Sequence, residues 1–203
     1  MKNKKKVIKE ARGWILSILV ALSITAIFNS RAYAKVQVQQ SSMENTLHNN
    51  QQLIIDKLSY NFTEPKRGDI IIFLQGKERG SIIDDTLETA SKLISGDQEN
   101  NRLVKKVIGI PGDEIDIKDG CVYLNGEKLD EPYAQGETLV EQESPLNKQP
   151  EYKIKVEENK LFVLGDNRPV SMDSRIFGLI DKSQVEGKAI FRVYPFNEAG
   201  KIN

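Results

Sequence analysis

The pattern of hydrophobic and polar positions predicts many short strands beyond residue 35. Some segments alternate apolar and polar side chains, as half-buried strands do, and others are continuously apolar, as strands buried on both faces are. Asp119-Gly120 and Asn125-Gly126 predict hairpin turns. The expected strands lie at residues 36–40, 51–58, 70–74, 102–109, 114–117, 121–124, 128–129, 152–156, 161–164 and 188–194. This pattern predicts an all-β fold, a β-barrel-like or sandwich-like domain of antiparallel strands.

The N-terminal part of the chain differs from this pattern. Residues 13–30 carry no charged side chain and follow a basic segment. A helix of this length, at 1.5 Å per residue, nearly spans a bilayer core of about 30 Å. The basic flank predicts a cytoplasmic N-terminus. We therefore expect a basic cytoplasmic tail at 1–12 and a single transmembrane helix at 13–30. The remaining residues, 31–203, are expected to form one domain on the outer side of the cell membrane.

Ala32-Tyr33-Ala34 leaves an alternative open for the same segment. It has the A-x-A form of a secretory cleavage site, so residues 1–34 also fit a removable signal peptide. The apolar run is longer than the usual h-region of about 7–15 residues, which favours a retained anchor.

Residues 75–101 are polar and charged, and we interpret them as an insertion carrying one short helix. Apolar residues recur at helical spacing from 83 to 94. Asp84 and Asp85 at the start and Gly96 beyond the end suit a capped helix. A surface helix packed on the domain explains the pattern more simply than membrane contact does.

The composition excludes several functions. The formal net charge is zero, so no overall field favours nucleic acid. Cys121 is the single cysteine and His48 the single histidine, which excludes an internal disulfide, a multi-cysteine metal site and a histidine-rich metal centre. We expect no cofactor and no metal. A Ser-His-Asp triad would depend on His48, which lies in a polar loop.

Lys105 and Lys106 stand inside an apolar, β-branched run, and this is the most informative stretch of the chain. Side chains alternate across a strand, so the two lysines point to opposite faces. One can face solvent, and the other must share a face with apolar neighbours. A lysine held against apolar surface has a lowered pKa and can act as a base near neutral pH. An edge strand with charges that deter aggregation is the simpler interpretation of the pair alone.

Three segments in this order, behind an anchor, resemble the bacterial type I signal peptidases (leader peptidases), in particular the compact single-anchor type of Gram-positive bacteria. They are SSMENTL at 41–47, RLVKKVIGIPGD at 102–113 and GDNRPVSMDSRIFG at 165–178. The resemblance covers nearly the whole chain after residue 34. It implies a serine endopeptidase that removes signal peptides from exported preproteins, and a Ser/Lys dyad in place of a triad.

The resemblance implies a role for five residues. Ser42 matches the family's nucleophile and Lys105 its general base, and a serine hydroxyl needs such a base to become a strong nucleophile. Ser171 matches a serine that hydrogen-bonds and orients the lysine. Asp173 and Arg175 match a pair that braces the site.

The resemblance also implies where the substrate lies. In the family an extended signal peptide binds beside strands that match 36–42 and 102–105, and two small pockets select the A-x-A residues before the cut. The expected pocket walls, each also an ordinary strand residue, are Val36, Val38, Met43, Leu103 and Val104. The expected partners are signal peptides of preproteins and the lipid bilayer, and we expect a monomer that binds no nucleic acid.

Three positions depart from the family pattern. Asn45 stands where the family usually has proline, and Lys106 where it has arginine. Gln40 stands where glycine or serine is frequent, in a region that contributes to the oxyanion hole. The backbone N–H of Ser42 can still donate to an oxyanion, while Gln40 either supplies its side-chain amide or crowds the pocket.

Two other functions remain as alternatives. A self-cleaving repressor-type protease also uses Ser/Lys chemistry, but the anchor and the lack of an N-terminal DNA-binding domain disfavour it. A catalytically decayed or non-enzymatic envelope β-domain that binds secreted proteins would fit if Gln40 and Asn45 marked a lost activity. Cleavage of an Ala-x-Ala peptide distinguishes the peptidase from the binding domain.

Overall fold

The structure is a computed structural model that describes residues 10, 12–21, 33–39, 41–76, 102–140 and 152–202. A helix covers residues 12–21. None of the helices in these ranges has both the length and the apolar character needed to cross a bilayer. Residues 22–30 of the predicted anchor, Gln40 and the predicted helix at 83–94 lie outside the described residues.

The larger sheet has eight strands in the order β1-β2-β11-β3-β4-β9-β10, with β12 paired to β11. All these pairs are antiparallel. The strands are β1 (Tyr33–Gln37), β2 (Gln52–Asp56), β3 (Ile70–Leu74), β4 (Arg102–Gly109), β9 (Lys160–Leu164), β10 (Ile180–Asp181), β11 (Val185–Tyr194) and β12 (Gly200–Lys201). β4 lies inside the sheet, where it pairs with β3 and β9.

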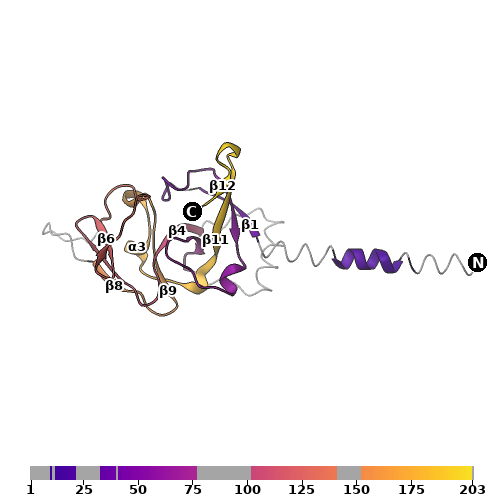
Figure 1. Cartoon of the computed structure of the whole chain (residues 1–203), viewed down its shortest axis with the longest axis horizontal. Helices are drawn as coiled ribbons and strands as arrows, with labels where there is room; N and C mark the ends of the chain where they lie inside the picture. Colours follow the sequence, from indigo (N-terminus) through magenta and orange to yellow (C-terminus); the bar gives the residue numbers. More distant parts are fainter. Residues whose placement is uncertain are drawn as a thin grey trace, which may run out of the picture.

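A smaller antiparallel sheet of four strands has the order β7-β6-β5-β8. Its strands are β5 (Glu114–Lys118), β6 (Cys121–Leu124), β7 (Glu127–Lys128) and β8 (Tyr152–Lys155). Figure 1 shows β6 and β8 at the end of the molecule opposite β1 and β12, with β9 and α3 (Ser174–Phe177) between them. The remaining short elements are 3₁₀ turns: η1 (Ser59–Asn61), η2 (Arg168–Val170), η3 (Lys182–Gln184) and η4 (Phe196–Glu198).

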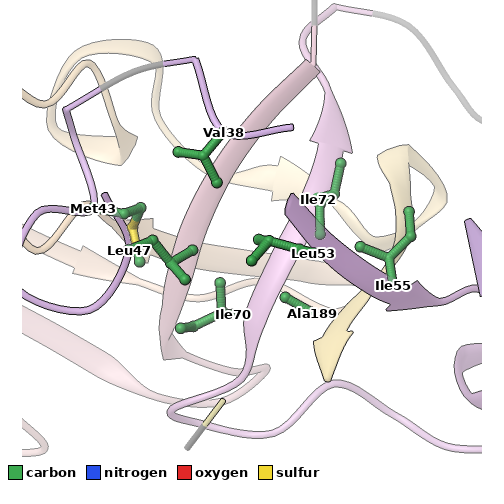
Figure 2. Close-up of a cluster of buried hydrophobic side chains, with 8 residues drawn as sticks. All are labelled: Val38, Met43, Leu47, Leu53, Ile55, Ile70, Ile72 and Ala189. Atoms are coloured by element: carbon green, nitrogen blue, oxygen red, sulfur yellow. The ribbon is translucent and has the colours of Figure 1, made fainter. Parts of the chain in front are cut away.

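Three clusters of buried apolar side chains form the core. Figure 2 shows the cluster that underlies the turn after β1, in which Met43 and Leu47 meet side chains of β2 and β3. A second cluster joins β3, β4 and β9, and a third connects β9 to the small sheet. Because Met43 and Leu47 are almost completely buried, the turn between them is fixed to the sheet by apolar packing.

The structure confirms the antiparallel β-fold and adjusts several details. The strands form two sheets, and the larger one is an open path from β1 to β10 in the described part of the chain. The first strand was expected at 36–40 and lies at Tyr33–Gln37 instead. Val38 extends its pairing, since it exchanges main-chain hydrogen bonds with Gln51 and Asn50. A cut after Ala34 would therefore remove the first two residues of a paired strand.

The prediction that one of the two adjacent lysines can face solvent is wrong. Lys105 is 1% exposed and Lys106 3% exposed. Lys105 lies opposite Ile71 and Lys106 opposite Ile70, and these two isoleucines belong to different core clusters. Both faces of β4 are covered at this point, so neither lysine serves as a solvent-facing edge charge.

Candidate active site

Ser42 lies in a tight turn between β1 and β2. Leu47 N donates to Met43 O at 2.7 Å and Thr46 N to the same carbonyl at 3.1 Å, which closes the turn. The turn is also bound to the loop after β9, because Asn167 N donates to Ser42 O at 3.0 Å and the Asn167 amide to Ser41 O at 3.2 Å. The Ser42 side chain is thereby presented toward β4.

Lys105 and Ser42 are in direct contact. Lys105 Nζ lies 2.7 Å from Ser42 Oγ, and both residues are buried. Burial lowers the pKa of Lys105 to about 8, and the nearby Arg175 acts in the same direction, while the carboxylates of Asp173 and Asp166 oppose the shift. With this pKa a minority of Lys105, roughly a tenth at pH 7, is neutral, and a neutral amine at this distance can accept the serine proton.

Ser171 lies next to the same pair. A Cβ placed on Gly165 would clash with Ser171 Oγ and lie 2.5 Å from Ser42 O, so only glycine permits the close approach of the two serine-bearing segments. The Ser171 hydroxyl is buried and has no hydrogen-bond partner among the described residues. The expected hydrogen bond from Ser171 to Lys105 is thus not formed in this structure, and the role of Ser171 in orienting the lysine stays a prediction.

Asp173 and Arg175 brace the loop that carries Ser171. Arg175 Nε and Nη2 donate to the two oxygens of Asp173 at 2.8 and 2.9 Å, and Asp173 caps α3 by accepting from Arg175 N. Arg175 Nη2 also reaches the carbonyls of Arg168 and Ser171 at 2.7 and 3.2 Å, and Gly165 N donates to Asp173 at 3.1 Å. One buried pair therefore holds both sides of the loop.

Lys106 has a carboxylate partner, in contrast to Lys105. Lys106 Nζ lies 2.9 Å from Asp166 Oδ2 and 3.4 Å from Thr46 Oγ1, and Thr46 Oγ1 donates to the same carboxylate oxygen. Burial lowers the pKa of Lys106 and raises that of Asp166, while their mutual attraction opposes both shifts. This cluster fastens the end of the turn that carries Ser42, called the nucleophile turn after the predicted role of Ser42, to β4 and to the loop after β9.

The predicted pocket residues lie close to the turn but differ in exposure. Val38, Met43 and Leu103 are buried in the core, while Val36 and Val104 are half-buried and pack against the cluster of Figure 2. Only the last two offer surface to a peptide in the state described here. The role of all five in substrate selection stays a prediction, and Gln40 lies outside the described residues.

Several contacts of the site were not predicted from the sequence. They are the two hydrogen bonds from Asn167 to the nucleophile turn, the Lys106–Asp166–Thr46 cluster, and the buried ion pair of Arg168 with Glu131 at 2.6 Å. The polar run that directly follows the apolar strand β9 was the available signal, because polar side chains at the end of a buried strand need partners.

A buried Ser–Lys contact of this kind places an amine where it can take a proton from a hydroxyl, which is what a hydrolase with a serine nucleophile requires. The family model described as "Signal peptidase, peptidase S26" matches residues 11–194. The signal peptidase I of Bacillus licheniformis is 35% identical over 99% of this chain and 96% of that protein. Signal peptidase IB of Staphylococcus aureus (strain Mu50) is 33% identical over 94% of this chain and 93% of that protein.

The chain therefore belongs to the signal peptidase family, peptidase S26. Among solved structures, a signal peptidase I from Enterococcus faecalis V583 is 28% identical, with a TM-score of 0.41, over 62% of this chain and 97% of that chain. The family assignment rests on the sequence matches.

Proposed function

We propose that this protein is a membrane-anchored signal peptidase that cuts exported preproteins after A-x-A, with Ser42 as nucleophile and Lys105 as general base. The observation that carries the proposal is the buried contact of 2.7 Å between Lys105 Nζ and Ser42 Oγ. The curated relatives named signal peptidase support the choice of substrate. The uncharged segment 13–30 supports the anchor, which would hold enzyme and preprotein in the same bilayer.

In the proposed reaction the neutral Lys105 amine accepts the proton of Ser42 as Oγ attacks the scissile carbonyl carbon. The resulting ammonium then donates its proton to the leaving amine, and the mature protein departs as the C–N bond breaks. Water hydrolyses the remaining ester, again with Lys105 taking a proton and returning it to Ser42. The Ser42 N–H is one donor for the oxyanion, while Gln40 either supplies its side-chain amide as the second or crowds the pocket.

The strand pairings support a substrate bound as an added strand. Residues 103–105 of β4 pair with β3, whereas the pairing of β4 with β9 begins only at Lys106. β1 is an edge strand that pairs with β2. An extended peptide placed between these two segments would bond to both main chains and bring its scissile bond to Ser42. Val36 and Val104 would then contact its small side chains.

The proposal is tested with the detergent-solubilised full chain and a preprotein that carries an Ala-x-Ala site. We expect cleavage after the second alanine, and losses of at least ~100-fold in Ser42→Ala and Lys105→Met, because each removes one member of the dyad. Lys155→Met, exposed on β8 of the small sheet and away from β1 and β4, is the matched control. Full activity in a folded Lys105→Met variant would refute the assignment of the base, and binding without cleavage by the wild type would favour the non-enzymatic domain.

A further inference from the structure

Tyr133 contacts two residues of the site from outside the segments that form it. Asn45 Nδ2 donates to Tyr133 O at 3.2 Å, and Lys106 Nζ lies 3.3 Å from the centroid of the Tyr133 ring. Tyr133 follows β7, and its half-buried side chain packs against the core cluster of the small sheet. Tyr133 therefore connects the small sheet to the nucleophile turn, through Asn45, and to β4, through Lys106.

We propose that Tyr133 is a positioning residue for the nucleophile, which holds Asn45 through its carbonyl and Lys106 through its ring so that Ser42 keeps its distance to Lys105. The inference rests on the proposed function and adds to that function a residue that touches neither the dyad nor the expected substrate path.

The first step of the argument concerns the Lys106 ammonium. This buried cation has Asp166 at 2.9 Å and Thr46 at 3.4 Å as polar neighbours. The face of the Tyr133 ring is a third neighbour of this ammonium, with its centroid 3.3 Å from Lys106 Nζ. An ammonium over an aromatic face is attracted by the ring quadrupole, most strongly where both are shielded from water. The ring thus stabilises Lys106 in the position from which it holds Asp166 and, through Asp166, the hydroxyl of Thr46.

The second step concerns the main chain at Asn45. Asn45 has a φ of 89°, in the left-handed region that asparagine tolerates better than most residues. Proline, which the family usually has at this position, is restricted to a φ near −65° and could not adopt this turn. Asn45 and Lys106 are two of the three departures from the family pattern, and both contact Tyr133. Tyr133, Asn45 and Lys106 therefore form one connected set of contacts.

The third step concerns the effect on catalysis. Asn45 and Thr46 lie a few residues after Ser42 in a turn closed by main-chain bonds to Met43 O. Without the Tyr133 ring, Lys106 loses a contact and the second half of this turn loosens. Ser42 Oγ then spends less time within hydrogen-bond distance of Lys105, which lowers the rate of proton transfer. Substrate binding is unaffected, so kcat falls while KM stays constant.

The experiment compares three variants of the full chain in detergent. Tyr133→Leu removes the ring, and we expect kcat about tenfold lower with unchanged KM. Tyr133→Phe keeps the ring and loses only the hydrogen bond from the hydroxyl to Glu131, so we expect its kcat to be close to that of the wild type. Tyr123→Leu is the matched control, because Lys118 Nζ lies 4.4 Å from the Tyr123 ring centroid in the small sheet, away from the site. An equal loss in Tyr123→Leu would overturn the proposal.

Hydrogen exchange of the Thr46 and Leu47 amides provides a readout that does not depend on cleavage. We expect faster exchange in Tyr133→Leu, and also in Asn45→Asp, which removes the donor but keeps the size and the tolerance of positive φ. Asn45→Asp carries the test if Tyr133→Leu does not fold. Unchanged exchange in the folded variants would refute the positioning role. Faster exchange in the variants, together with a wild type that cleaves no preprotein, would support the positioning contact and refute the proposed function.

Discussion

The two lysines at the centre of β4 lie in different electrostatic surroundings. Lys105 Nζ contacts the neutral hydroxyl of Ser42 at 2.7 Å, whereas Lys106 Nζ lies 2.9 Å from the carboxylate of Asp166. Both side chains are buried, and burial lowers the pKa of each. The carboxylate that opposes this shift most strongly at Lys105 is Asp173, which forms an ion pair with Arg175.

The comparison shows that one strand places one buried lysine beside a hydroxyl and the next beside a carboxylate. A buried lysine beside a hydroxyl loses its proton readily, while a buried lysine paired with a carboxylate keeps it. The nucleophile turn contacts both: Ser42 meets Lys105, and Thr46 bonds to the carboxylate that Lys106 holds. The lysine with a carboxylate partner therefore holds the turn whose Ser42 contacts the other lysine.

The largest effect is expected from Gly165→Ala, which would disturb the contact between the Ser42 and Ser171 segments. The added Cβ would clash with Ser171 Oγ and with the Ser42 carbonyl, so the two segments must separate. A displacement of about 1 Å near reacting groups costs about 100-fold in rate, and we expect a loss of that size in kcat for preprotein cleavage.

Gly200→Ala is the control for this substitution, since no atom lies within 4 Å of a Cβ placed there. The overpacked site should also lower the free energy of unfolding by about 1–3 kcal/mol. Wild-type kcat in a folded Gly165→Ala variant would show that the close approach of the two segments does not matter for catalysis.

The second prediction is that the same substitution has opposite effects on stability at the two lysines. Lys105→Met removes a buried amine whose pKa, about 8, lies below the 10.5 of a free lysine, so the free energy of unfolding at pH 7 should rise by up to about 3 kcal/mol. Lys106→Met leaves Asp166 buried without its partner, and the same quantity should fall by about 3 kcal/mol. Urea unfolding of both variants measures the difference.

The pH dependence of this difference has a definite sign. Between about pH 8 and 10.5 unfolded wild type binds a proton at Lys105 that the folded state has lost, so wild-type stability rises with pH there. The advantage of Lys105→Met should be complete below pH 8 and should shrink above it. Lys160→Met, which removes a surface ion pair with Glu157, is the control and should leave the urea concentration at the midpoint of unfolding unchanged. Destabilisation by Lys105→Met at pH 7 would contradict the assigned environment.

The sequence predicted the strands best where the local pattern is strongest. The continuously apolar run at 70–74 is β3 as expected, and the β-branched run at 102–109 is β4. The four-residue helix α3 was not predicted, because so short a helix leaves no periodicity and depends on its Asp173 cap. Which strands belong to which of the two sheets was also not predicted, since this is determined by pairings between strands far apart in the chain.

The candidate site shows the same limit. Ser42 and Lys105, 63 positions apart, were placed together by the family resemblance, and the structure brings them into contact. The contacts of Lys106 with Asp166 and Tyr133 were not anticipated, because no local pattern relates residues so distant in the chain. Both adjacent lysines are buried because both faces of β4 are covered by other parts of the chain. Strand alternation predicts that the two side chains point to opposite faces, but not that both faces are covered.

The smallest effect is expected in the pH profile of Lys106 variants. In wild type, kcat/KM should rise with a midpoint near pH 8 as Lys105 loses its proton. Lys106→Met removes a nearby positive charge and frees the charge of Asp166, which raises the pKa of Lys105, so the midpoint should move to higher pH. Lys106→Arg keeps the cation and should leave the midpoint in place. A profile of Lys106→Met that coincides with wild type would mean that the two sides of β4 are electrostatically independent, and that Lys106 acts on catalysis through the geometry of the turn alone.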